Sequence, residues 1–154
     1  AIFGAGHVGQ ALANLAPWLE AKLLVIDGRE AEEIQPKLPA QRAFELLCID
    51  SPEAEIDGLA ADSLVLIMTH NHDLDQAILE RALTRACFPY VGLIGSGRKW
   101  QRFQARLRSK GFSDEQLASV HCPIGISQAS KSPAAIALST ATQLMEVLSR
   151  LNAS

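Results

Sequence analysis

Cysteine is scarce in this sequence, which has only three among 154 residues. Cys48, Cys87 and Cys122 lie far apart and form no C-x-x-C pair, a pattern that argues against a disulfide framework or a structural zinc site. Because free thiols persist in reducing compartments, we expect a cytoplasmic protein.

Long apolar runs and aromatic residues are scarce too. No run approaches the roughly 20 apolar residues that a membrane helix needs, and no basic-then-apolar signal peptide opens the chain, so we expect no membrane contact. Aromatic residues make up 5% of the chain and do not alternate with basic ones, which argues against nucleic-acid binding. The remaining composition, 48% apolar and 20% charged, is that of one ordinary globular domain.

Acidic residues are missing from one stretch of a chain that is otherwise acidic. Residues 1–80 hold fourteen acidic and four basic residues, whereas residues 81–113 hold eight basic residues and no acidic one. This segregation predicts a basic face that binds phosphate or an acidic partner. The net charge of −3 is a further argument against a nucleic-acid partner.

The start of the chain carries the glycine motif G-x-G-x-x-G. An apolar strand leads into Gly4, Gly6 and Gly9, and a helix with apolar residues at helical spacing follows. In dinucleotide-binding folds these glycines allow a tight turn, the approach of a pyrophosphate and close helix–strand packing. His7 and Val8 lie inside the motif, where His7 either donates a hydrogen bond to a phosphate or fills an exposed position. The alternative for the whole motif is a glycine turn that binds no nucleotide.

A second apolar strand, Leu23–Ile26, ends at Asp27, about 20 residues beyond the glycines. Dinucleotide-binding folds place at this position the acid that accepts the ribose hydroxyls. Asp27 would therefore favour NAD over NADP, although Arg29 could turn toward a 2′-phosphate. Only three residues precede Gly4, so we expect the chain to be part of a longer protein.

Strand and helix patterns alternate along the rest of the chain. After a polar connection over residues 28–40, strands are predicted at 44–49, 63–68 and 90–94, with a short one from Val120. Helices are predicted near residues 73–83, 97–110 and 133–151. This alternation indicates an α/β protein with a Rossmann-like, doubly wound parallel sheet in a single domain. The ends of the strands should then form the ligand site.

Polar residues follow the fourth strand and the short sixth one. His70, His72 and Asp73 could ligate a metal. The alternative is that Thr69 and His70 only bond the backbone, while Asp73 caps the next helix. Cys122, beside a histidine, is either a nucleophile or a buried, inert thiol.

A second glycine turn, Gly95-Ser96-Gly97, follows the fifth strand and opens a helix. Its glycines and the Ser96 hydroxyl suit an anion. Arg98 and Lys99 stand in the first helical turn, where the helix dipole disfavours cations, and a bound anion would offset that cost. The alternative is a solvated helix face, which we expect for Arg106, Arg108 and Lys110.

Together these segments resemble the XdhC/CoxI family, the xanthine dehydrogenase accessory proteins. The resemblance is carried by residues 3–9, Thr69-His70-x-His72-x-x-Asp75, Ile94-Gly95-Ser96-x-Arg98-Lys99 and His121-x-Pro123-Ile124-Gly125. It spans residues 1–154 and corresponds to the C-terminal Rossmann domain of that family, so the family's N-terminal domain is absent from this chain. One departure is Ser127, where the family pattern has an acidic residue.

The resemblance implies an accessory protein rather than an enzyme. Such a protein binds the molybdenum cofactor and assists its sulfuration and its insertion into a molybdenum hydroxylase. The hydroxylase is the implied partner, and a cysteine desulfurase and a homodimer stay open as further interactions. The alternatives are an NAD(P)-dependent oxidoreductase, supported by Asp27, and a nucleotide-sensing module.

The predicted cofactor-binding residues come from all of these segments, and no metal ligand is assigned beyond Cys122 as a possible soft ligand to molybdenum. They are Gly4, Gly6, His7, Val8, Gly9, Asp27, Arg29, Thr69, His70, Gly95, Ser96, Arg98, Lys99 and Cys122.

Overall fold

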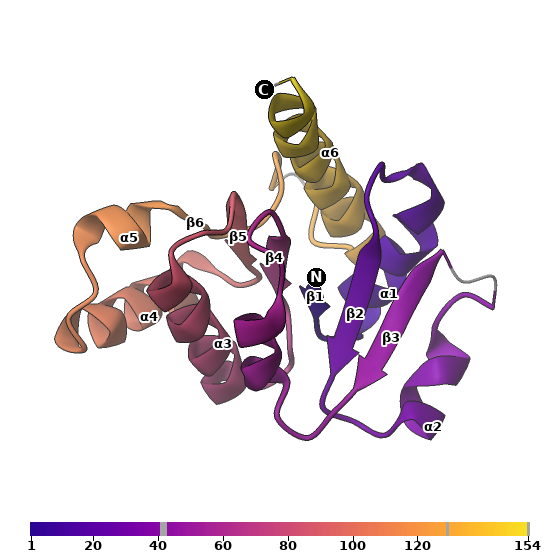
Figure 1. Cartoon of the computed structure of the whole chain (residues 1–154), viewed down its shortest axis with the longest axis horizontal. Helices are drawn as coiled ribbons and strands as arrows, with labels where there is room; N and C mark the ends of the chain where they lie inside the picture. Colours follow the sequence, from indigo (N-terminus) through magenta and orange to yellow (C-terminus); the bar gives the residue numbers. More distant parts are fainter. Residues whose placement is uncertain (41–42, 129, 154) are drawn as a thin grey trace.

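Six parallel strands form one sheet in the computed structural model, which describes residues 1–40, 43–128 and 130–153. The strands are β1 (Ile2–Phe3), β2 (Leu23–Asp27), β3 (Phe44–Cys48), β4 (Leu64–Ile67), β5 (Tyr90–Leu93) and β6 (Val120–His121). Their order is β3-β2-β1-β4-β5-β6, so the chain reverses its direction of travel across the sheet after β3 (Figure 1). This arrangement confirms the predicted Rossmann-like, doubly wound α/β fold.

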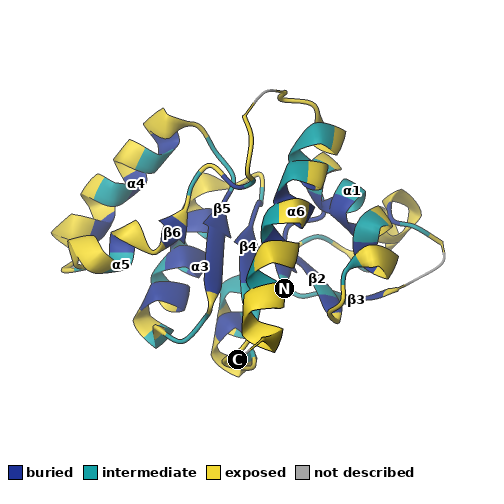
Figure 2. Cartoon of the chain, turned by 90° about the horizontal axis from the view of Figure 1, so that it is seen from above, coloured by how far each residue is buried: buried dark blue, intermediate teal, exposed yellow. Residues whose placement is uncertain are grey.

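Helices connect the strands on both faces of the sheet. They are α1 (His7–Leu15), α2 (Ala31–Ile34), α3 (His72–Arg85), α4 (Gly97–Ser109), α5 (Asp114–Ala118) and α6 (Pro133–Asn152). Short 3₁₀ turns lie at η1 (Ala16–Trp18), η2 (Gln35–Lys37) and η3 (Pro52–Gly58). Burial is concentrated on the strands and on the inner sides of the helices, whose outer sides are exposed (Figure 2).

Two apolar cores flank the sheet because successive side chains of a strand point to opposite faces. Ile2 belongs to a core that also contains Leu12 of α1 and Leu144 of α6. Phe3, the next residue, belongs to the opposite core with Ile78 of α3 and the inner side of α4. The paired strands β1 and β4 therefore lie between two helical layers, which fixes the position of the loops that follow them.

Two local predictions are wrong. Asp73 was expected to cap α3, but Asn71 does so, because its side-chain oxygen accepts hydrogen bonds from the N–H groups of Asp73 and Leu74 at 2.9 and 3.1 Å. Residues 28–40, expected as a polar connection, contain the short helix α2. The unpredicted helix α5 begins with a capping box between Ser113 and Gln116.

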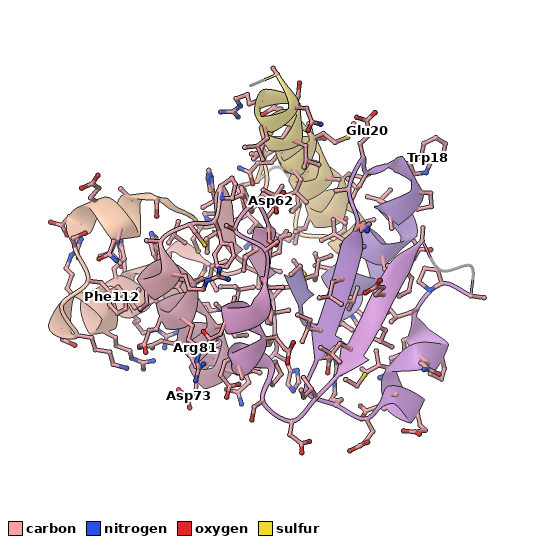
Figure 3. All side chains as sticks on the ribbon, viewed as in Figure 1. Trp18, Glu20, Asp62, Asp73, Arg81 and Phe112 are labelled. Atoms are coloured by element: carbon pink, nitrogen blue, oxygen red, sulfur yellow. The ribbon has the colours of Figure 1, made fainter. Side chains whose placement is uncertain are left out.

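The surface carries few large apolar side chains. Trp18, at the end of η1, is the most exposed of them at 75% and projects away from the sheet (Figure 3). Among the described helices, none combines the length and the apolar character that crossing a membrane requires.

Candidate functional site

Two glycines of the G-x-G-x-x-G motif, Gly4 and Gly9, are required by the fold itself. Gly4 has a φ of +111°, and a Cβ there would lie 2.5 Å from the carbonyl oxygen of Met68. A Cβ on Gly9 would collide with the carbonyl oxygen of Gly4. Backbone atoms cannot move aside as a side chain can, so these two positions accept only glycine.

Gly6 is different, because nothing in the described chain requires glycine there. Its φ is −75°, and a Cβ would meet no atom within 4 Å. Gly6 also stands at the N-cap of α1, where it offers no side chain to the first N–H groups. The helices α3, α4, α5 and α6 begin instead with the capping residues Asn71, Ser96, Ser113 and Ser132. The start of α1 is thus open and uncapped, as an anion site requires.

Asp27, at the end of β2, holds the glycine loop in place through a hydrogen bond. Its Oδ2 accepts a hydrogen bond from the backbone N–H of Ala5 at 2.7 Å. Arg29 forms a fork with the same carboxylate, as Nε donates to Oδ1 and Nη2 to Oδ2, both at 2.9 Å. The N–H of Arg29 donates to Oδ1 as well, also at 2.9 Å. Although burial by itself raises the pKa of Asp27, these hydrogen bonds outweigh it and hold the pKa below its usual value.

A cavity of about 350 Å³ lies beside this ion pair, at the carboxyl ends of the strands. Its lining residues are Gly4, Ile26, Asp27, Gly28, Arg29, Asp50, Pro52, Thr69, His70, Asn71 and Leu74. Five of the predicted site residues meet there, from the loops after β1, β2 and β4. This is the crevice at the reversal of strand order, where open α/β sheets bind their ligands.

Thr69 and Lys99 both donate hydrogen bonds to Asp75, which the sequence prediction did not place in the site. The buried Asp75 accepts at Oδ1 from the hydroxyl and N–H of Thr69, at 2.6 and 3.0 Å. Its Oδ2 accepts from the Lys99 ammonium at 2.7 Å, and this ammonium also donates to the carbonyl of Ile94 at 2.8 Å. The network therefore ties the loop after β4 to the loop after β5.

The buried pair changes the interpretation of Lys99. We expected its charge to face an external anion in the first turn of α4, but Lys99 is buried and its anion is Asp75. Asp75 could have been recognised as buried, because it occupies the same helical face as Ile78, Leu79 and Ala82. An acid on an apolar stripe requires a buried partner.

Most of the predicted basic face is neutralised within the protein. Arg81, Lys99, Arg108 and Lys110 form ion pairs with Asp57, Asp75, Asp114 and Glu80. Arg85 donates to the carbonyls of Ile56 and Leu59, and Arg106 donates to the amide of Gln76. Among the described residues of this segment, only Arg98 and Arg102 are exposed cations without such a contact. They lie one turn apart at the start of α4.

Ser96 caps α4, and its hydroxyl accepts from the N–H of Lys99 at 3.3 Å. Gly95 before it has a φ of +151°, and a Cβ there would lie 2.5 Å from Cδ of Lys99. Cys122 is half-buried beside this turn, with Sγ 3.9 Å from the carbonyl oxygen of Gly95. Burial raises the pKa of the Cys122 thiol to about 11, against the opposing effect of the Lys99 ammonium, so the thiol is protonated at neutral pH.

Within the described residues, the histidines are not grouped as metal ligands. In the described part of the chain, no three His, Cys, Asp or Glu side chains are grouped as a metal site. His7, His70 and His72 are all exposed. His121 stacks on Tyr90, with ring centroids 4.6 Å apart, and burial lowers its pKa.

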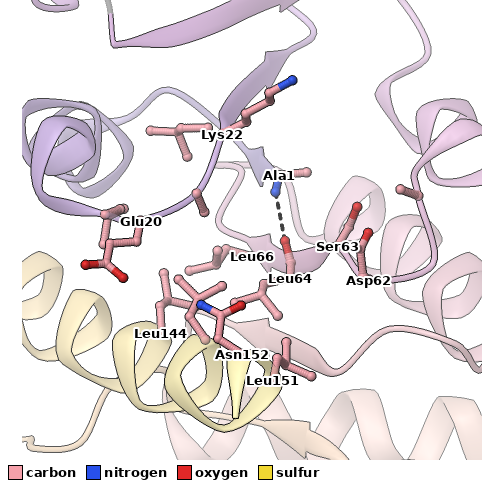
Figure 4. Close-up of a pocket in the computed structure, with 15 residues that line it drawn as sticks. Ala1, Glu20, Lys22, Asp62, Ser63, Leu64, Leu66, Leu144, Leu151 and Asn152 are labelled. Carbon is pink, nitrogen blue, oxygen red and sulfur yellow. Dashed lines mark hydrogen bonds between the residues drawn. The ribbon is translucent and has the colours of Figure 1, made fainter. Parts of the chain in front are cut away.

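A larger cavity, of about 630 Å³, lies elsewhere, beside the amino ends of the strands (Figure 4). Leu64 and Leu66 of β4 and Leu144 and Leu151 of α6 line it. Ligands of this fold class bind at the carboxyl ends of the strands, and the predicted site residues do not line this larger space. The smaller cavity beside Asp27 is therefore the better candidate despite its size.

Comparison with known proteins agrees with the fold. A family model described as the XdhC Rossmann domain matches residues 1–144. The Escherichia coli (strain K12) protein YqeB, whose function is uncharacterized, is 32% identical over an alignment of 150 residues that covers 95% of this chain and 26% of YqeB. A solved chain from Bacillus halodurans, named a xanthine dehydrogenase, matches with a TM-score of 0.78 at 27% identity, over 97% of this chain and 42% of that one. This chain thus spans less than half the length of either relative.

Proposed function

The chain belongs to the XdhC family, whose Rossmann domain it contains, and we propose that it binds the molybdenum cofactor as an accessory protein of a molybdenum hydroxylase. The family membership confirms the resemblance on which the sequence prediction depended. The likeness to a chain named a xanthine dehydrogenase supports a hydroxylase of that type as the partner.

The observation that carries the proposal is the open position at Gly6. Nothing within 4 Å of a Cβ at Gly6 explains the glycine, whereas Gly4 and Gly9 are explained by their own backbone surroundings. Close approach of a ligand to the uncapped start of α1 would explain it. The pterin of the molybdenum cofactor carries a phosphate, or a pyrophosphate in its dinucleotide forms, and such groups fit N–H donors at a helix start.

The rest of the site would hold the remainder of the ligand. Thr69 and His70 line the cavity beside Gly4, and His7 is exposed at the first turn of α1. The exposed Arg98 offers a second contact for an anion beside the start of α4, although Ser96 caps the first turn of that helix and Lys99 is paired with Asp75. The bound cofactor would supply the molybdenum centre, and the Cys122 thiol, with Sγ 3.9 Å from the carbonyl oxygen of Gly95, is a candidate soft ligand beside this turn.

The proposal extends to the proteins with which this chain would interact. Arg98 and Arg102 present two unpaired cations that suit an acidic surface of the hydroxylase. Sulfuration would add a cysteine desulfurase as a second partner, with both encounters in the cytoplasm. A homodimer is an assembly that this proposal allows, and sedimentation of the purified chain tests it.

Purification from a host that makes the molybdenum cofactor tests the function. We expect molybdenum and pterin to co-purify with the chain in a fixed ratio, measured by metal analysis and by fluorescence of the oxidised pterin. A chain purified from a cofactor-deficient host is the control. Absence of both molybdenum and pterin from the wild-type preparation would overturn the proposal.

A nicotinamide dinucleotide is the alternative ligand, and Asp27 at the end of β2 is the observation that favours it. Calorimetry with NAD and NADP separates the two functions. Tight binding of NAD without co-purified molybdenum would favour the oxidoreductase or nucleotide-sensing alternatives.

A further inference from the structure

The carboxylate of Asp27 has no acceptor position left for a ligand. Its two oxygens together accept four hydrogen bonds, two from the N–H groups of Ala5 and Arg29 and two from the Arg29 guanidinium. A carboxylate offers about four lone-pair sites. A ribose can therefore bind Asp27 only if some of these donors leave.

The donors that can leave are those of the guanidinium, since the N–H of Ala5 and the N–H of Arg29 belong to the backbone. Nε and Nη2 of Arg29 supply one donor to each oxygen of Asp27, at 2.9 Å in both bonds. A vicinal diol supplies the same pattern, one O–H donor to each oxygen. We propose that Arg29 occupies the position of a ribose 2′,3′-diol in the free protein, and that a ligand's ribose displaces it onto Glu33. This inference rests on the ligand site proposed above.

Glu33 is placed to receive the displaced guanidinium. It lies in α2, four residues after Arg29, and Nη1 of Arg29 already lies 4.0 Å from its Oε1. The side chain of Asp27 is 4% exposed, that of Arg29 26% and that of Glu33 53%, so the guanidinium moves outward as it changes partner. Lys37, 3.8 Å from the same oxygen of Glu33, is exposed and can turn to solvent.

The same arrangement rejects a phosphorylated ribose. A 2′-phosphate would enter a space bordered by the carboxylates of Asp27 and Asp50, with Glu33 beside Arg29. One guanidinium that already faces Asp27 and Glu33 cannot also neutralise a dianion. The ligand class is therefore a nucleotide with a free 2′,3′-diol, which for the proposed cofactor means a nucleotide-bearing form rather than the bare pterin phosphate.

Calorimetry with nucleoside diphosphates tests the displacement. The probes are the four ribonucleoside 5′-diphosphates, their 2′-deoxy analogues and adenosine 2′,5′-bisphosphate. We expect Arg29→Met to bind the ribonucleotides about three- to tenfold more tightly than wild type, because the competing donor is gone. Arg81→Met, which removes an arginine paired with Asp57 far along α3, is the matched control and should change nothing.

Removal of the Glu33 carboxylate, which would receive the displaced guanidinium, should lower the affinity for ribonucleotides. Glu33→Gln should weaken ribonucleotide binding about twofold or more, since the displaced guanidinium loses its acceptor. Glu32→Gln removes an equal charge from the neighbouring position of α2 and is the control. Neither change should matter for the 2′-deoxy analogues.

Three results would overturn the inference. They are weaker ribonucleotide binding by Arg29→Met, tighter binding of the 2′,5′-bisphosphate than of ADP by wild type, and no binding of any diphosphate by either protein. These measurements need no molybdenum. A chain that fails to co-purify with molybdenum but shows the predicted Arg29 and Glu33 effects would contradict only the proposed function.

Discussion

The buried pair between Asp75 and Lys99 makes the sharpest prediction about stability. In Lys99→Met the apolar stem keeps its packing, but the Asp75 carboxylate loses the ammonium 2.7 Å from its Oδ2. The side chain of Asp75 is 0% exposed and that of Lys99 is 7% exposed, so water cannot replace the lost cation. The two hydrogen bonds from Thr69 remain, but both go to the other oxygen.

The expected cost is about 3–5 kcal/mol of unfolding free energy, the usual range when one partner of a buried ion pair is removed. The double variant Asp75→Asn with Lys99→Met should recover much of this loss, because the side-chain oxygen of Asn can still accept from Thr69 and no charge is left buried. Arg98→Met is the matched control, since Arg98 precedes Lys99 on α4 and is exposed.

Urea unfolding followed by circular dichroism measures all three variants against wild type. Arg98→Met should leave the midpoint unchanged, Lys99→Met should lower it strongly, and the double variant should fall between them. The reasoning is refuted if Lys99→Met unfolds at the same urea concentration as Arg98→Met. It is also refuted if the double variant unfolds at a lower urea concentration than Lys99→Met.

Three further predictions concern other residues at the carboxyl ends of the strands. Gly4→Ala should cost about 3 kcal/mol or more in urea unfolding, because its Cβ meets backbone at a positive φ, whereas Gly58→Ala, in open space, should not. Because hydrogen bonds hold the pKa of Asp27 below its usual value, its contribution to stability is complete above that usual value and is lost as pH falls through the lowered pKa. The stability difference between wild type and Asp27→Asn should therefore shrink below about pH 4, and a constant difference from pH 7 to pH 3 would contradict this. The Cys122 thiol should react slowly with iodoacetamide at pH 7 and faster toward its pKa of about 11, as followed by mass spectrometry in a variant without Cys48 and Cys87.

The fold was predictable because its signals are local and periodic. Apolar runs such as Leu64–Ile67 and the glycine motif before α1 indicate strands and turns without reference to distant residues. One error, the cap of α3, lies where two polar residues compete for one role. Asn71 and Asp73 are both good caps, and only the position of the first helical turn decides between them.

The sequence predicted which of these residues lie together at the strand ends but not how their side chains pair, and their role in cofactor binding stays a prediction. The strand-end rule correctly brought Gly4, Asp27, Thr69 and His70 to one cavity. It could not show that Arg29 covers Asp27, because that contact depends on the path of the chain after β2. Pairings across more than twenty residues, such as Lys99 with Asp75, need the fold before they can be assigned.

The most direct test of the central claim compares two glycines in a host that makes the molybdenum cofactor. Gly6→Val should abolish most co-purified molybdenum and pterin, with a loss of affinity of tenfold or more, or about 1.4 kcal/mol, because the new side chain fills the space that the ligand would occupy. Gly58→Val adds the same atoms at an exposed position that also has no neighbour within 4 Å, and it should retain the cofactor. Both variants should keep the circular dichroism of wild type. Equal cofactor content in Gly6→Val, Gly58→Val and wild type would contradict the assignment of the site.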